Sequence, residues 1–494
     1  MTDRARPFGA PPRPRRLFFP GRRHHLTRAT RFEVSLPALV PPERARSANR
    51  WITLAATGAF LLLAFRQSAV VPATLGSTWS FLIVMATGGL WLLTRPFERD
   101  APRLADGAFL TGAFYIATSL VSTGWAMHRG LPYGASATNM DLVMIRDVIV
   151  LAYFGFLLSN FVTFAAVKMM ISVIVVGVTL SSAYALIQVA TGVDLAAVIV
   201  PPLTKNGGQT LTDNLLREGM LRPAGAAGHP LELSFLVTLT FPLALALVFA
   251  AIHRRRRAWP WLLACLIIGA ALLSSLSRSA IIGSAAALVA MSFFWSRRRS
   301  VSVFAGISLG GLAVLTARPD LLSTLVNVFV TSEIDDSLHS RSRALTYSVD
   351  MMIDSPILGC GHGCLVEPFH PVLDNQFLGR LIEGGLLGLL SFAVLLCAPL
   401  YTAARAARLF DRDASTPEAT AHELSIGLVG SVVSIIVINF VLDTTGFVQS
   451  WTTMWIILAL CWTMCRLAAA TYERPQASDY PSSGSKASVT SGQG

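Results

Sequence analysis

The stretch from Ser340 to Gly388 holds most of the polar side chains that this otherwise apolar chain could use for chemistry. Carboxylate and imidazole groups can take a proton from a hydroxyl, and guanidinium groups can bind phosphate, when geometry brings them within hydrogen-bond reach. We therefore expect the chemistry to reside in this stretch. Its candidate side chains are Arg341, Arg343, Asp350, Asp354, His362, Glu367, His370 and Asp374.

Two further arginines lie beside apolar runs. Arg222 opens the segment R-P-A-G-A-A-G-H-P-L-E-L, in which a Gly/Ala-rich turn leads to Pro230, a residue typical of helix starts. Arg278 lies among serines in L-S-S-L-S-R-S-A-I-I-G. The planar guanidinium group presents paired donors to phosphate oxygens, so both arginines are candidate diphosphate ligands. The alternative for each is an interfacial anchor that extends its charge to water.

The composition predicts an all-α, polytopic membrane protein. The 494 residues are 53% hydrophobic and only 14% charged, and the mean hydropathy is +0.57. Repeated apolar runs approach the ~20 residues that a helix needs to cross the hydrocarbon core. Backbone groups in lipid must be paired within their own segment, and runs of this length fit helices rather than the short alternating strands of a barrel.

We expect about twelve transmembrane helices, with the N- and C-termini in the cytoplasm. Lys and Arg collect beside the spans on a single side in this threading, as the positive-inside rule requires. The predicted spans are 51–71, 75–94, 107–124, 142–165, 168–190, 231–252, 258–275, 279–296, 301–317, 376–400, 422–442 and 450–470.

The extracytoplasmic side then carries two long connections, 191–230 and 318–375, the second directly before the tenth helix. Ordered loops too long to be simple connectors are often functional. The active site is therefore predicted to face the extracytoplasmic side, within a membrane-embedded domain at 51–472.

Two tails, 1–50 and 473–494, are predicted to be disordered. The first 50 residues contain twelve Arg but only three acidic residues, which gives +9 of the chain's net charge of +12. Such a Pro/Arg-rich segment cannot bury a core. We interpret it as a topology anchor attracted to the anionic lipid bilayer, not as a nucleic-acid-binding segment. The C-terminal tail is rich in Ser and Gly.

Four of the six cysteines lie in predicted spans, where they are interpreted as small apolar packing residues. Cys360 and Cys364 flank His362 in the external loop, where a local disulfide can form. Three ligands so close together, without a second paired motif, are a weak zinc signal, so no metal site is predicted.

These motifs resemble those of the O-antigen ligase and O-antigen polymerase superfamily. The resemblance rests on R-P-A-G-A-A-G-H-P, L-S-R-S-A, P-I-L-G-C-G-H-G and D-N-Q-F-L-G-R-L-I-E-G-G-L-L-G, in this order and on one predicted side of the membrane. It implies an inverting membrane glycosyltransferase that needs no metal or other cofactor. The donor would be a polyprenyl-diphosphate-linked oligosaccharide and the acceptor a glycan or cell-wall polymer, at the outer face of a bacterial plasma membrane.

Carried over by position, the resemblance implies that Arg222 and Arg278 hold the diphosphate, with help from Arg341 or Arg343. The loop before the tenth helix would supply the base that activates the acceptor hydroxyl. Within that helix, the residues that would pack it against its neighbours are Glu383, Gly384, Gly385 and Gly388.

The expected base position departs from the family pattern. Ligases of this family commonly place His before the Asn of the last motif, whereas this chain has Asp374 before Asn375, and its nearest His is His370. Either carboxylate or imidazole can serve as general base, or this member does not catalyse. The Asp favours a polymerase-like or otherwise divergent role over a ligase that attaches glycan to lipid A core.

Two alternative functions belong to other classes. A transporter or flippase for lipid-linked glycans would place ionisable groups near the bilayer midplane, and Arg146 and Asp147 are the main charges inside a predicted span. Most polar candidates lie at one face instead, so transport ranks below transfer. A non-catalytic subunit of an envelope-assembly complex is the third interpretation.

Overall fold

A computed structural model describes residues 38–72, 77–95, 107–132, 134–206, 216–217, 220–317, 319, 323, 345–366, 369–371, 373–411 and 416–473, to which the structural statements below refer. All of these residues belong to the compact unit Leu36–Gly494. Arg341 and Arg343, Glu367, and the tails at 1–37 and 474–494 lie outside the described residues.

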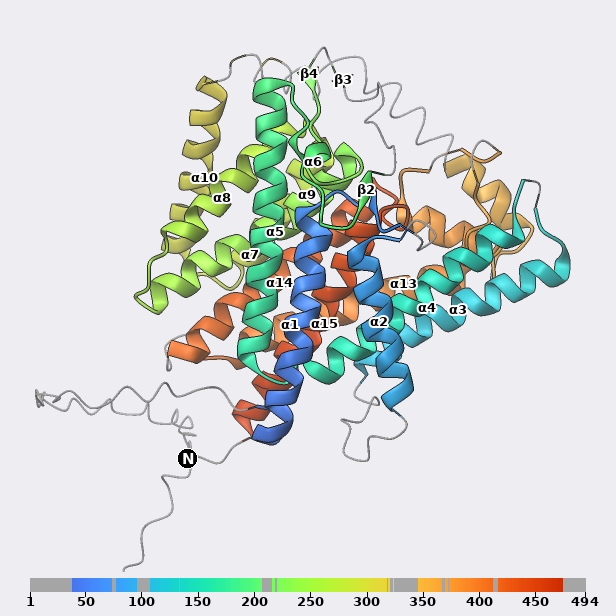
Figure 1. The fold of residues 1–494 in the computed structure, drawn as a ribbon, viewed down its shortest axis with the longest axis horizontal. Coiled ribbons are helices and arrows are strands. Elements are labelled where there is room, and N and C mark those ends of the chain that lie inside the picture. The colour runs from blue at the N-terminus through green and yellow to red at the C-terminus, as the bar shows by residue number, and fades with distance from the viewer. Residues whose placement is uncertain are drawn as a thin grey trace, which may run out of the picture. The chain divides into compact units, whose positions relative to one another are not determined.

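Each of the twelve predicted spans overlaps a helix (Figure 1), although the first, 51–71, extends past the end of its helix at Ala64. In chain order these helices are α1 (Pro42–Ala64), α2 (Trp79–Thr94), α3 (Ala108–Arg129), α4 (Ala137–Asn160), α5 (Phe164–Thr191), α7 (Pro230–His253), α8 (Trp259–Ser274), α9 (Arg278–Ser292), α10 (Arg297–Ala317), α13 (Gln376–Leu409), α14 (Thr416–Asn439) and α15 (Val448–Tyr472).

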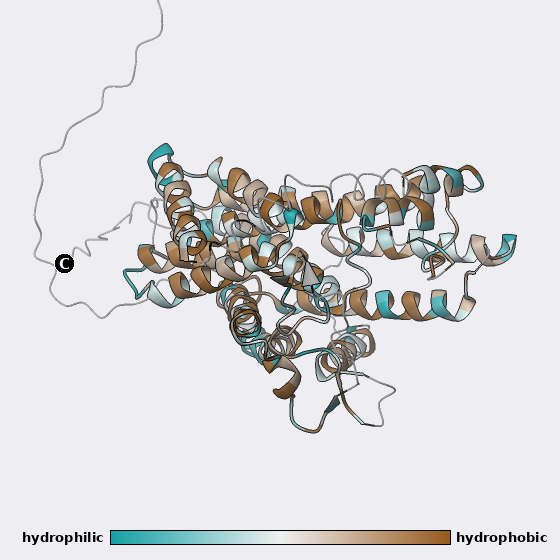
Figure 2. Cartoon of the chain, turned by 90° about the horizontal axis from the view of Figure 1, so that it is seen from above, coloured by the Kyte–Doolittle hydropathy of each residue, from teal (hydrophilic) through white to brown (hydrophobic). Residues whose placement is uncertain are grey.

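Seven of these helices are long and apolar enough to cross a membrane, namely α4, α5, α7, α10, α13, α14 and α15. Three more, α2, α8 and α9, are apolar but shorter. Apolar residues predominate along the helices, as Figure 2 shows. The fold is therefore that of an all-α, polytopic membrane protein, while the number of twelve spans stays a prediction.

Helix α1 begins at Pro42, before the predicted first span. Residues 42–50 are thus helical, although the sequence placed them in a disordered tail. Pro at the first helical position and Glu43 in the first turn both favour a helix start here.

The core is built around α7, which is buried along most of its length and packs against α14, α8, α5 and α9. Helices α1 and α5 run side by side (Figure 1), and α2 packs on α4. The predicted outer connections between these helices contact one another.

These outer connections are tied together at one end of the helices. Strand β1 (Ala69–Val70) pairs antiparallel with β2 (Lys205–Asn206), with Ala69 opposite Asn206. Strand β3 (Leu216–Arg217) pairs in the same way with β4 (Met220–Leu221), and the short helix α6 (Leu195–Val198) lies in the same connection. The Trp125 indole N–H donates to Ser355 Oγ at 3.2 Å, which joins the end of α3 to the segment before α13. We call this end the predicted outer end.

The described part of the predicted external loop, residues 345–366, differs from a solvated loop. Residues 345–353 are helical, and the following turn is buried, with His362 only 1% exposed. Cys360 and Cys364 form a disulfide, as the sequence allowed. Both cysteines pack with Leu373 and Ile382 in a small apolar cluster.

Helix α13 is broken at Gly385, whose φ of 63° lies in the left-handed region. The break frees backbone groups that the loop before α13 then pairs. The carbonyls of residues 382 and 383 accept from the N–H groups of Cys360 and Gly361 at 3.0 and 2.9 Å. The N–H groups of residues 386 and 387 donate to the carbonyls of residues 356 and 357 at 2.9 and 3.2 Å.

Gly385, predicted as a packing residue of this helix, thus also forms a break in it. Only glycine adopts its backbone conformation without strain, and a Cβ there would collide with the backbone of Ile357. Both the break and the close packing of the preceding loop therefore explain the glycine.

We predict that Gly385→Ala destabilises the protein by about 1–3 kcal/mol, because alanine adds backbone strain and a backbone clash. Gly384→Ala is the matched control, since a Cβ at Gly384 meets no atom within 4 Å. Thermal unfolding of both variants in detergent measures the difference. Equal melting temperatures would show that the break does not depend on glycine.

Candidate functional site

The structure brings the segment of Arg222 to the turn that carries Arg278. Arg222 Nε donates to the backbone carbonyl of Ser275 at 3.4 Å. Ser275 ends α8, and Arg278 is the first residue of α9, so the connection is the tight hairpin that the sequence predicts. The hydroxyls of Ser277 and Ser279 share a hydrogen bond of 2.8 Å beside it. Two guanidinium-bearing segments and a group of hydroxyls thus lie together.

The loop 222–229 that carries Arg222 is held in one conformation. Gly225 has a φ of 56°, and a Cβ there would run into the carbonyl of Ser181. Arg66 Nη2 donates to the Gly225 carbonyl at 2.8 Å, and the same guanidinium forms a two-point ion pair with Asp194 at 2.6 and 2.8 Å. The small side chains of this Gly/Ala-rich sequence therefore allow the loop to pack closely in one conformation.

His229 links this loop to the connection before α15. Its Nδ1 accepts from the backbone N–H of Leu231 at 3.1 Å and so caps α7. Its ring stacks on Phe447, with the centroids 5.8 Å apart. Burial, followed by the nearby charge of Arg222, lowers the pKa of His229. This histidine therefore favours its uncharged form.

The connection 440–447 also contacts the start of α13. The side-chain carbonyl of Gln376 accepts from the N–H groups of Thr444 and Thr445 at 2.8 and 3.1 Å. At the next residues, the N–H of Gln449 donates to Glu232 of α7 at 3.0 Å. The starts of α7, α13 and α15 are thus joined at the predicted outer end.

Asp374, the predicted base in the family's position, is exposed directly before α13. Its φ of 45° is unusual for a residue other than glycine. The next residue, Asn375, caps the helix by accepting from the N–H of Leu378 at 3.1 Å. Strained backbone of this kind often occurs at functional sites, and it orients Asp374 relative to a fixed helix start.

His370, the other predicted base, is buried, with 8% of its surface exposed. Its Nδ1 is hydrogen-bonded to the hydroxyl of Tyr347, whose pKa is raised by burial. Its Nε2 is buried and makes no hydrogen bond within the described part of the chain. The two candidate bases thus differ in environment, because His370 is buried and Asp374 is exposed to solvent.

A buried polar network, which sequence reasoning did not identify as a unit, lies behind the start of α13. We call Asp147, His362, Arg380 and Glu383 the buried network. The ring of His362 contacts Asp147 Oδ2 through Nε2 at 2.9 Å, and Arg380 Nη1 through Nδ1 at 2.6 Å. Arg380 Nη2 pairs with Glu383 Oε2 at 3.1 Å, and the other Glu383 oxygen accepts from the N–H of Gly363 at 3.0 Å.

These contacts select one tautomer of His362. Its Nδ1 lies 3.0 Å from a Glu383 oxygen and also close to Arg380, but one nitrogen cannot donate to the first and accept from the second. With its hydrogen on Nε2, the ring donates to Asp147 and accepts from Arg380, while Arg380 pairs with Glu383. Arg146, 3.6 Å from Asp147, supplies a second guanidinium. The negative charges of Asp147 and Glu383 are then balanced by the positive charges of Arg146 and Arg380.

Glu383, predicted as a packing residue of its helix, therefore has a further role that the sequence did not indicate. Glu383 is an ion-pair partner that joins α13 to the loop before it, because a buried carboxylate requires compensating donors. The sequence contains a usable signal, since Asp147 lies inside an apolar run and must find a partner there. Arg380 and Glu383, three residues apart on one helix face, are the corresponding signal on α13.

No group of three or more His, Cys, Asp or Glu side chains in the described ranges has the geometry of a metal site. A separate cavity lies between α1, α2 and α4, and none of these candidate side chains lines it. We take as the candidate site the Arg222 loop, the Arg278 turn and residues 370, 371 and 373–376, which the contacts above connect.

Part of this region also matches a known protein family. Residues 263–393 match the family model of the O-antigen ligase, which confirms the family resemblance in this range. Arg278, His370, Asp374 and the break at Gly385 lie inside the match, while Arg222 precedes it. No curated protein matches the chain. The family match indicates a membrane protein with a glycosyl-transfer function on lipid-linked glycans.

We predict that Asp147→Asn destabilises the protein by about 3–5 kcal/mol, because it leaves the opposite charges of the buried network without their partner. Asp141→Asn, on the same helix but exposed, is the control and should unfold like the wild type. Unfolding followed by gel filtration after heating compares the two. If the two variants match, the network does not anchor the loop to α4.

Proposed function

We propose that this chain transfers or polymerises a polyprenyl-diphosphate-linked glycan at the outer face of the plasma membrane. The observation that carries the proposal is the contact between the Arg222 loop and the Arg278 turn, within and beside residues that match the O-antigen ligase family. A guanidinium pair at a membrane surface suits a lipid diphosphate, because each fork offers two parallel donors to phosphate oxygens.

In the proposed reaction, an acceptor hydroxyl oxygen attacks the anomeric carbon of the donor sugar from the face opposite the diphosphate. The bond between that carbon and the phosphate oxygen breaks, its electron pair leaves with the polyprenyl diphosphate, and the configuration inverts. Negative charge increases on the leaving oxygen, so fixed cations there stabilise the transition state more than the ground state. Arg222 and Arg278 take this role.

The acceptor's proton passes to a base before α13. We assign this role to Asp374, because its carboxylate is exposed to an incoming polymer and its position next to a capped helix start is fixed. His370 is the alternative, with Tyr347 orienting its ring through Nδ1. Asp374 in place of the histidine common in ligases favours a polymerase-like role.

We predict that Arg278→Ala lowers the rate of glycan transfer by about 100-fold or more, the cost of removing one preorganised charge stabiliser. Purified protein receives a polyprenyl-diphosphate oligosaccharide in buffer with EDTA, and glycan length is measured. Arg298→Ala, an exposed arginine at the start of α10, is the matched control. Full activity of Arg278→Ala would refute the phosphate role, and donor lipid crossing vesicles at constant glycan length would indicate transport.

We predict that Asp374→Asn lowers kcat by about 100-fold or more, the usual contribution of a general base, with donor binding unchanged. His370→Gln should retain most activity if His370 supports Tyr347 only. The reverse pattern would assign the base to His370. If both variants keep wild-type rates, neither residue takes the proton and the assignment of this loop is wrong.

A further inference from the structure

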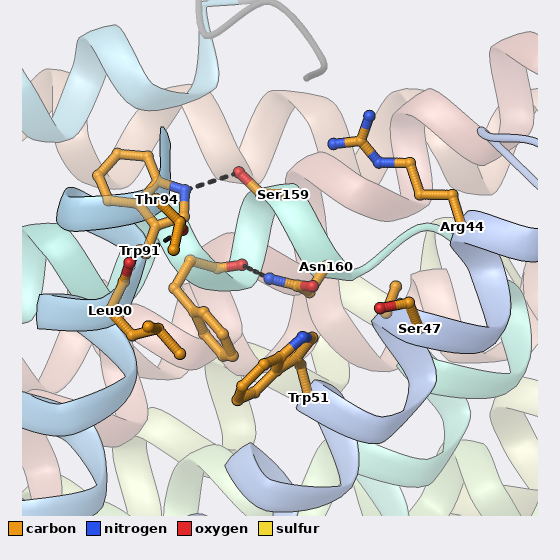
Figure 3. Close-up of a pocket in the computed structure, with 10 residues that line it drawn as sticks. Arg44, Ser47, Trp51, Leu90, Trp91, Thr94, Ser159 and Asn160 are labelled. Carbon is orange, nitrogen blue, oxygen red and sulfur yellow. Dashed lines mark hydrogen bonds between the residues drawn. The ribbon is translucent and has the colours of Figure 1, made fainter. Parts of the chain in front are cut away.

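A cavity of ≈ 520 Å³ lies between α1, α2 and α4 at the end of the helices opposite the candidate site. Three helix faces form it (Figure 3), each contributing residues three or four positions apart, which places them on one side of their helix. The lining residues are Arg44, Ser47, Ala48 and Trp51 of α1, Leu90, Trp91 and Thr94 of α2, and Phe156, Ser159 and Asn160 of α4.

The lining is divided into a polar and an apolar part. Trp51 packs edge-on against Phe156, with the ring centroids 6.4 Å apart, and these rings with Leu90 form an apolar wall. Ser47 and Arg44 stand about one and two turns nearer the N-terminus of α1 than Trp51 (Figure 3), so the cationic end lies toward the predicted cytoplasmic surface. The cavity therefore has a positively charged end and, next to it, an apolar part.

The wall opposite Arg44 is rigid. The Trp91 indole N–H donates to Ser159 Oγ at 3.0 Å, and this links α2 to α4. The ring of Trp91 lies against Gly155, where any Cβ would come within 2.6 Å of it. Asn160 is held by a bond from its side-chain N–H to the Phe156 carbonyl at 2.9 Å. The packing of these helices therefore fixes the shape of the cavity.

The cavity is far from the proposed donor site. Arg44 lies near the start of α1, whereas Arg66, just beyond the end of the same helix, contacts the Arg222 loop. At ~1.5 Å per residue, the helix between them spans about 30 Å. A lipid bound at Arg44 is therefore distinct from the glycan donor.

We propose that this cavity binds an anionic phospholipid of the cytoplasmic leaflet. Arg44 pairs with the phosphate, Ser47 and Asn160 face the polar head group, and an acyl chain lies along Trp51, Leu90 and Phe156. The volume falls within the ~300–1,000 Å³ of ordinary small-molecule sites.

Two features favour a lipid over a soluble anion. Next to the cavity-lining Leu90, one turn along α2, Leu93 is 72% exposed, and such an exposed apolar side chain on an apolar helix suits acyl chains. Arg44 also lies in the first turn of α1, at the predicted cytoplasmic end, and cytoplasmic leaflets attract basic side chains through their anionic lipids.

Native mass spectrometry and thermal unfolding of the delipidated full-length protein test the proposal. We expect phosphatidylglycerol to bind and raise the melting temperature, and phosphatidylcholine with the same acyl chains to do so much less. Arg44→Ala should weaken phosphatidylglycerol binding about tenfold, as expected for loss of one charge-assisted contact. Arg46→Ala is the matched control, since Arg46 is exposed on the same helix and does not line the cavity.

A second variant separates loss of the site from loss of folding. Ser47→Trp fills the cavity from an exposed position while keeping Arg44, and it should also weaken phosphatidylglycerol binding. The proposal is overturned if Arg44→Ala and Arg46→Ala bind the lipid equally, or if Ser47→Trp binds it like the wild type. An equal shift with glycerol phosphate alone would assign the site to a soluble anion.

Discussion

The break in α13 at Gly385 is the constraint on which the candidate site depends. Inside a low-dielectric bundle, each unpaired backbone N–H or carbonyl costs several kcal/mol. The loop at 356–361 pairs four such groups across the break, two carbonyls and two N–H groups. The loop and the helix therefore form one unit, and neither can shift without exposing polar groups. Since Asp374 and the cap Asn375 begin the first part of this helix, the break also fixes the proposed acceptor side.

The buried network adds a second, electrostatic tie across the same region. Asp147 of α4 and Glu383 of α13 are both buried, and they are tolerated because His362, Arg380 and Arg146 supply donors and positive charge. This arrangement also bears on the transport alternative. A charge in a carrier pathway must exchange partners during transport, whereas Asp147 is enclosed by His362 and the Trp451 indole, which donates to it at 3.1 Å. The charges inside this span therefore have a structural explanation, which favours transfer over transport.

Hydropathy and charge were enough to predict the helices, because an apolar run in lipid has few alternatives to a helix. The same reasoning found the hairpin at Arg278, whose two flanking runs leave room only for a tight turn. It failed where polar groups are paired over long sequence distances. Nothing local indicates that His362 meets Asp147, 215 residues away, so the segment around His362 appeared to be a solvated loop. The break at Gly385 was not predicted for a related reason, since a Gly-Gly pair in a helix is compatible with close packing, with a break or with both.

The topology itself creates a suitable setting for an anionic donor. Helices α7, α9, α13 and α15 all begin at the predicted outer end, near Arg222 and Arg278. Each helix start carries partial positive charge from its unpaired N–H groups. His229 and Asn375 already cap the starts of α7 and α13, and Glu232 accepts from Gly228 at the same start of α7 and from Gln449 at the start of α15. The start of α9, which carries Arg278, has no side-chain cap, so its N–H groups would add to the positive charge at the proposed diphosphate site. This explains how two guanidinium groups on fixed backbone could suffice for a leaving group whose charge increases during the reaction.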